Sequence, residues 1–229
     1  MVKANRVDDL GRAYAGSQLQ IQIYLSRREP ELTASVVTAL HNAGVYLENI
    51  QWLSPLEKEK FVELRDGAFL ERLGLPGLRS ELSAFWPKRG PQWDGLALFT
   101  PGPRILLIEA KSYPEEMIGS GCQASPISRN LIEKSIAKTK RWLRVNENVD
   151  WLGPLYQYAN RLAHVYFLRE IGQIETWLVN LCFFDDPHKP TSLDVWQKQL
   201  PIIKRQLGFS GRKIPYTVDV FLPASTRNE

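Results

Sequence analysis

An acidic residue followed two positions later by a lysine occurs once in this chain of 229 residues, at Glu109 and Lys111. Residues two apart in a strand point to the same face of a sheet. We therefore expect the carboxylate of Glu109 and the ammonium of Lys111 to face one site, with Ala110 facing the core. Residues 105–108 before them are all apolar. A charged pair at the end of such a strand lies at the sheet margin or is desolvated, and both situations favour a functional site.

Asp94 stands upstream of this pair, at the start of another apolar run. Residues 100–103 (TPGP) separate the two runs and predict the turn of an antiparallel hairpin. That pairing would place Asp94 opposite Glu109, beside Lys111. Carboxylate oxygens suit Mg²⁺ or Mn²⁺, which bind through one or two carboxylates plus substrate phosphate. A lysine beside such a site can orient a metal-activated water and offset the charge of a phosphoryl transition state.

The hairpin with its three charged side chains resembles the PD-(D/E)xK nuclease superfamily, over roughly residues 78–184. The resemblance implies that Asp94 and Glu109 bind a divalent metal together with the backbone carbonyl of Ala110. It also implies that Lys111 positions the attacking water and that the products carry 5′-phosphate ends. The sequence departs from the motif before the aspartate, where a tryptophan replaces the proline.

The same resemblance implies two further side chains. Many members of the superfamily place another acid on the helix before the hairpin, and here Glu81 is the nearest candidate, with Glu63 and Glu71 as rivals. Some members also use a glutamine on a later helix. Gln157, within residues 156–161 (YQYANR), could fill that role.

A basic helix is expected from about residue 128 to residue 145, one element after the hairpin. Its cationic side chains could follow a nucleic-acid phosphate backbone, although a solvated helix face explains the same charges. The candidate contacts are Arg129, Lys134, Lys138 and Arg141. Among the seven tryptophans, most lie in apolar patterns typical of a core, and Trp93 beside Asp94 is the one candidate for contact with a base.

Other chemistry has less support. Asp94 could be an Asp-Gly turn signal, and Glu109 and Lys111 an exposed cross-strand pair. The three histidines share no metal-ligand spacing, and the sequence contains no phosphate-binding loop or nucleophile elbow. With only Cys122 and Cys182, the chain cannot form a disulfide framework or a thiolate zinc cluster.

Periodicity and turn residues predict the elements that must hold these side chains. The expected helices cover residues 31–43, 57–73, 78–86, 128–145, 154–170 and 192–206, and the expected strands cover 93–99, 104–111, 174–184 and 214–222. Residues 17–25 fit a strand or a helix, because alternating apolar residues coincide with a capping-box pattern. We expect the helices that follow the hairpin to pack on the sheet. This order predicts an α/β or α+β fold with a mixed sheet, and the resemblance implies a restriction-endonuclease-like core with an N-terminal helical extension.

Composition bounds the remaining expectations. The chain is 44% hydrophobic and 24% charged, as in globular domains. It contains no apolar run near the roughly 18 residues of a membrane span, and its first residues lack the apolar core of a signal peptide. We expect a cytoplasmic protein without membrane contact. A helical region over residues 1–75 and a nuclease-like domain over 76–229 are expected, or a single continuous unit. The net charge of +4 permits a polyanionic partner without requiring one.

The sequence thus predicts a metal-dependent phosphodiesterase that acts on nucleic acid, with DNA as the expected substrate, Mg²⁺ or Mn²⁺ as cofactor and a homodimer as a compatible assembly. The alternative is a catalytically silent nucleic-acid-binding or assembly module with the same fold. A hydrolase for another phosphate or carboxyl substrate is a third hypothesis.

Overall fold

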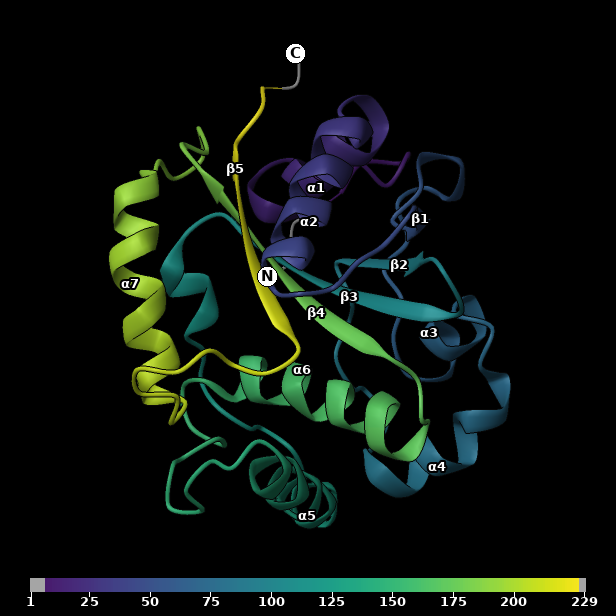
Figure 1. Cartoon of the computed structure of the whole chain (residues 1–229), viewed down its shortest axis with the longest axis vertical. Coiled ribbons are helices and arrows are strands. Elements are labelled where there is room, and N and C mark those ends of the chain that lie inside the picture. The colour runs from purple at the N-terminus through teal and green to yellow at the C-terminus, as the bar shows by residue number, and fades with distance from the viewer. Residues whose placement is uncertain (1–6, 227–229) are drawn as a thin grey trace.

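The computed structural model describes residues 7–226, which form a mixed α/β fold around a five-stranded sheet (Figure 1). The strand order is β1-β2-β3-β4-β5. The first three strands, β1 (Ile50–Ser54), β2 (Gly95–Phe99) and β3 (Arg104–Lys111), are antiparallel neighbours. The last two, β4 (Thr176–Phe184) and β5 (Thr217–Pro223), continue the sheet in parallel with β3.

Helices cover both faces of this sheet. Apolar side chains of α1 (Gly16–Arg27) and α2 (Glu29–Asn42) form one core layer with the strands. On the opposite face, α6 (Tyr156–Tyr166) packs against β4, and α5 (Pro126–Trp142) packs outside it (Figure 1). We expected both to contact the sheet, but α6 already covers this face, so α5 packs on α6. The other helical segments are α3 (Asp66–Arg72), α4 (Arg79–Phe85) and α7 (Leu193–Gln206), with single turns at Glu57–Glu59, Pro76–Leu78, Pro114–Met117 and Phe167–Ile171.

Most of the expected elements are confirmed. The two central strands form an antiparallel hairpin in which Gly95 pairs with Ile108 and Phe99 pairs with Arg104. The helices expected over 31–43, 78–86, 128–145, 154–170 and 192–206 are present with small changes at their ends, as are the strands expected over 174–184 and 214–222. These segments have strong local periodicity, and the tertiary structure retains it.

The continuous helix expected over residues 57–73 is wrong: a single turn at Glu57–Glu59 and helix α3 at Asp66–Arg72 are separated by a non-helical segment over residues 60–65. Lys60 and Phe61 have φ values of 54° and 53°, which a right-handed helix does not accommodate. Leu64 then pairs with Trp93 in an isolated antiparallel bridge, and the Trp93 amide donates to the Leu64 carbonyl at 3.0 Å. Phe61 is buried and Leu64 is partly buried, whereas Val62 is exposed, and helix α3 begins only at Asp66.

Residues 17–25, which the sequence left open, belong to helix α1. Their alternation looks strand-like because Gln20 and Gln22 are buried among apolar neighbours. Both amides are satisfied by backbone groups: the Gln22 side chain accepts from the Ala13 amide at 2.8 Å, and the Gln20 side chain accepts from the Ser225 amide at 2.8 Å. Glutamine therefore does not mark an exposed face in this helix.

Residues 7–75 contribute directly to the central sheet and its core. Strand β1, which the sequence did not predict, pairs with β2 through Ile50 and Phe99. Phe69 and Leu70 of α3 are fully buried in the same apolar cluster as Trp93. This segment is consequently more than a set of helices beside the sheet.

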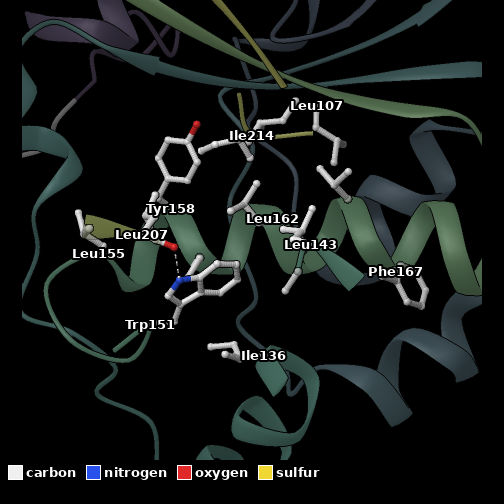
Figure 2. Packing of buried hydrophobic residues seen from close by; sticks show 14 of the residues in the cluster. Leu107, Ile136, Leu143, Trp151, Leu155, Tyr158, Leu162, Phe167, Leu207 and Ile214 are labelled. Carbon is white, nitrogen blue, oxygen red and sulfur yellow. Dashed lines mark hydrogen bonds between the residues drawn. The ribbon is translucent and has the colours of Figure 1, made fainter. Parts of the chain in front are cut away.

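The core between α6 and the sheet is shown in Figure 2. Leu162 of α6 and Leu107 of β3 belong to this cluster, and the Trp151 indole donates to the Leu207 carbonyl at 3.1 Å. Close packing here fixes the position of α6 over β3 and β4, which determines what its polar residues can reach. Within residues 7–226, no helix is both long and apolar enough to cross a membrane.

Candidate active site

The β2–β3 hairpin brings the three predicted charged residues together. The Ala110 amide donates to Asp94 Oδ2 at 2.7 Å, and Lys111 Nζ lies 2.6 Å from Glu109 Oε1. Glu109 and Lys111 share one face of β3, as the spacing predicted, and the side chain of Ala110 is buried on the other face. Glu109 is 3% exposed and Lys111 is 8% exposed, so this pair is desolvated. The alternative interpretation of Glu109 and Lys111 as an exposed cross-strand pair is therefore wrong.

Helix α6 holds Glu109 from the opposite side. Gln157 Nε2 donates to Glu109 Oε1 at 3.0 Å, while the guanidinium of Arg161 forms an ion pair with Glu109 Oε2. Residues four apart lie on the same face of a helix, so one face of α6 supplies both contacts. The structure thus places Gln157 beside the predicted acids, and Arg161 joins it as a group that the sequence did not single out.

Arg161 is fixed on every side. Its other nitrogens donate to Asn160 Oδ1 at 3.0 Å and to the Gln92 carbonyl at 2.9 Å. Its guanidinium carbon lies 5.0 Å from the centre of the Trp93 ring. Because its side chain is only 6% exposed, Arg161 is a permanent buried cation next to Glu109. The four-residue spacing between Gln157 and Arg161 could have indicated that Arg161 faces the same site, because it places both side chains on one face of the helix.

Of the three further acids proposed from the sequence, the structure brings Glu63 toward the cluster. Its carboxylate accepts from Gln92 Nε2 at 2.9 Å, and its charge interacts with those of Glu109 and Arg161. Glu81, the nearest candidate in sequence, is exposed on α4 and bonded to Ser80. Glu71 is likewise half exposed and pairs with Arg79. The bridge between Leu64 and Trp93 explains this outcome, since it draws the residue before Leu64 to the hairpin.

Burial and neighbouring charges perturb the three central groups differently. Burial and the nearby Glu109 raise the pKa of Asp94 from 3.8 to about 7, and Glu63 adds to this effect. Burial alone would raise the pKa of Glu109, but Arg161 and Lys111 outweigh it and lower that pKa. For Lys111, burial is outweighed by Glu109 and Asp94, which raise its pKa. Near neutral pH, Glu109 and Lys111 are thus charged while Asp94 is close to its midpoint.

Replacing Glu63 with glutamine should lower the pKa of Asp94 below about 7, because one of the negative charges that opposes its ionisation is removed. Carboxyl ¹³C chemical shifts followed across a pH titration would measure this. Glu81→Gln is the matched control, since Glu81 is fully exposed on α4 and should leave the titration of Asp94 unchanged. Equal titration curves for the two variants would contradict the placement of Glu63 beside the cluster.

The tryptophan considered for base contact is a core residue. Trp93 is fully buried and makes edge contacts with Phe69 and His164, at 6.1 Å and 6.0 Å between ring centres. It therefore cannot stack on a nucleic-acid base. Burial lowers the pKa of His164 to about 4, which keeps this histidine neutral within the same cluster.

The basic residues of α5 lie apart from the carboxylate cluster. All four candidates are exposed, and α6 lies between α5 and the sheet (Figure 1). Arg129 pairs with Glu133, and Arg141 lies 3.9 Å from Glu147. These contacts fit a solvated helix face, while Lys134 and Lys138 still present charge to solvent.

A polar row that the sequence did not reveal extends across the sheet from Glu109. In register, Glu109 of β3 pairs with Asn180 of β4, and Asn180 pairs with Asp219 of β5. Asn180 Nδ2 lies 2.8 Å from the Tyr158 hydroxyl and 2.9 Å from Asp219 Oδ1, and Lys204 forms an ion pair with Asp219. The strand register alone creates this row, because the residues are distant in sequence.

The donor chemistry at the cluster suits a hard divalent cation. Among residues 7–226, no three His, Cys, Asp or Glu side chains converge as a ready metal site. Two carboxylates and a carbonyl are nevertheless a sufficient protein contribution for Mg²⁺, which keeps waters and recruits substrate phosphate. Burial and, next to it, the charge of Glu109 raise the pKa of Asp94, and a bound cation would offset both effects. The residues Asp94, Glu109 and Ala110 therefore fit the predicted ion.

The cluster opens to solvent through a narrow space. A cavity of about 10 Å³ is lined by Glu109, Lys111, Gln157 and Tyr158, together with Met117. That volume is about one water molecule. A substrate phosphate could reach Glu109 and Lys111 through this opening only if the side chains around it move, whereas Asp94 lies outside its lining and is partly exposed.

Fold and site together define a mixed α/β protein with a buried carboxylate and lysine centre at the end of its central strand. Comparisons of the chain with protein-family models, curated proteins and solved structures find no match.

Proposed function

We propose that this protein is a metal-dependent nuclease of the PD-(D/E)xK type, with a restriction-endonuclease-like core, that hydrolyses DNA to 5′-phosphate ends. The observation that carries the proposal is the convergence of Asp94, Glu109 and Lys111 at the end of one hairpin, with Gln157 of a later helix on the same carboxylate.

The topology supports this proposal. Three antiparallel strands are followed by a helical crossover and a strand parallel to the third, which matches the hairpin, helix and strand order on which the resemblance rests. The charged residues lie at the carboxyl end of β3, next to the carboxyl end of β4. In α/β sheets this end of the strands is the usual place for a ligand.

Each residue has a chemical role in the proposed reaction. Lys111 is held protonated by Glu109, so its ammonium can donate a hydrogen bond to the attacking water and offset negative charge on the phosphate. Asp94, Glu109 and the Ala110 carbonyl would hold the metal. A bound Mg²⁺ would supply Lewis acidity and lower the pKa of a water. Gln157 keeps the Glu109 carboxylate in a fixed orientation.

The test is a cleavage assay on labelled duplex, single-stranded and branched DNA and on RNA, with Mg²⁺, Mn²⁺ or EDTA. We expect metal-dependent cutting by the wild type and a loss of about 10²–10³-fold in Lys111→Ala, because a preorganised charge at the reacting phosphate is removed. Lys198→Ala is the control, since Lys198 is an exposed lysine paired with Asp194. Intact substrates under every condition would count against the enzyme.

The catalytically silent module is the second candidate, and Arg161 is the observation that favours it. Its guanidinium occupies one oxygen of Glu109, and the opening to the cluster is narrow. Such a module would bind nucleic acid in EDTA and be indifferent to Lys111→Ala. Binding through Arg129, Lys134, Lys138 and Arg141 would weaken with salt, and their replacement would reduce that salt dependence. Activity on small phosphate or carboxyl substrates alone would instead identify another hydrolase.

A further inference from the structure

We propose that Arg161 sets the metal affinity of this site. Its positive charge neutralises the Glu109 carboxylate in the metal-free protein, so a divalent ion binds well only together with a substrate phosphate and weakly to the protein alone. This inference rests on the proposed function and names a positioning residue for it.

Arg161 is held beside Glu109 by several contacts at once. Besides the ion pair, its nitrogens are bonded to Asn160 Oδ1 and to the Gln92 carbonyl, and its guanidinium lies against the Trp93 ring. A guanidinium does not lose its proton in a protein. The positive charge therefore stays next to Glu109 whether or not a metal ion is bound.

The charges around Glu109 nearly balance. Three acids, Glu63, Asp94 and Glu109, interact with two cations, Lys111 and Arg161, while Glu116 interacts with Lys111 from outside this group. With all groups ionised, the net charge is −1, which is little attraction for a divalent ion that must also lose water. A phosphate adds negative charge at the same place, so metal and substrate should each strengthen the binding of the other.

Arg169 provides a comparison that distinguishes the charge of Arg161 from its packing. Arg169 is another cation close to an aromatic ring, since its guanidinium carbon lies 3.7 Å from the centre of the Tyr216 ring and its Nη1 donates to the Thr176 carbonyl at 3.0 Å. Its partners are a ring and a backbone group, where Arg161 has a carboxylate of the cluster. Loss of either arginine costs packing, but only loss of Arg161 changes the charge beside Glu109.

The experiment is a Mn²⁺ titration of the full chain followed by electron paramagnetic resonance. Arg161→Met keeps an unbranched side chain over Trp93 without its charge and should bind Mn²⁺ roughly tenfold or more tightly than the wild type. Arg161→Lys keeps the charge and should resemble the wild type, as should Arg169→Met. Unchanged binding in Arg161→Met, or tighter binding in Arg169→Met as well, would overturn the role of Arg161.

A measurement on the wild type covers the case in which Arg161→Met does not fold, which circular dichroism would reveal. A 5′-phosphorylated oligonucleotide, the expected product, should tighten Mn²⁺ binding to the wild type roughly tenfold, after subtraction of the ions that the oligonucleotide binds alone. Tight binding without it, unchanged on its addition, would reject the inference. If the wild type binds Mn²⁺ tightly without the oligonucleotide and also cleaves DNA, only the role of Arg161 is rejected and the nuclease proposal is retained. If no Mn²⁺ binds under any of these conditions, the nuclease proposal is rejected as well.

Discussion

Replacement of Asp94 by asparagine should stabilise the metal-free protein at about pH 8 and abolish cleavage. Burial and the charge of Glu109 raise the pKa of Asp94 from 3.8 to about 7, so folding opposes its ionisation. Between these values the native state binds more protons than the unfolded state, and stability falls as pH rises. Asparagine carries no charge, and its oxygen can still accept from the Ala110 amide. The difference in pKa corresponds to about 4 kcal/mol, and because Asp94 is partly exposed we expect a smaller gain, on the order of 2 kcal/mol, in the free energy of unfolding.

Urea denaturation of wild type and Asp94→Asn in EDTA measures this effect. The gain should be full at about pH 8, shrink as the pH falls from about 7 to about 4, and vanish below 3.8, where Asp94 is protonated in both the native and the unfolded state. Asp194→Asn, an exposed position on α7, should change stability by less than about 0.5 kcal/mol. A variant that is less stable than wild type at about pH 8 would show that the native cluster does not oppose the ionisation of Asp94.

The same variant should lose cleavage by about 10³-fold or more, because a metal-binding carboxylate disappears. Loss of activity in a protein that has become more stable separates a chemical role from a folding defect. Stability and activity that fall together would instead indicate damage to the hairpin.

Trp93→Ala should cost about 3–5 kcal/mol of unfolding free energy, because it opens a cavity in the core below the cluster. Trp93 is fully buried, its ring contacts Phe69 and His164, and it lies beneath the Arg161 guanidinium. The variant should therefore lose part of the order of Arg161, while the main-chain bridge between residue 93 and Leu64 is retained, because its donor is a backbone amide.

Chemical denaturation monitored by far-ultraviolet circular dichroism measures the loss. Trp52→Ala is the matched control, because Trp52 is only partly buried on β1 and bonds to Thr33. It should cost clearly less than Trp93→Ala. A similar loss in the two variants would mean that Trp93 has no special place in the core.

The local part of this site was predictable from the sequence. Alternation within a strand placed Glu109 and Lys111 on one face, and a turn rich in proline and glycine placed Asp94 opposite them. These relations hold within twenty residues of chain and depend on backbone geometry alone. Gln157 came from the resemblance to a known family, and the packing of α6 places it on Glu109.

Periodicity and turn chemistry act over short distances, and they were enough to predict the mixed α/β class, most helices and strands, and the charged hairpin. The approach of Glu63 to the cluster, the exposure of Glu81 and the ion pair between Arg161 and Glu109 depend instead on how distant segments pack. Strand β1 and the polar row from Glu109 to Asp219 also arise only from the sheet register. Contacts between distant segments depend on how whole elements pack, and that information is spread over the entire core.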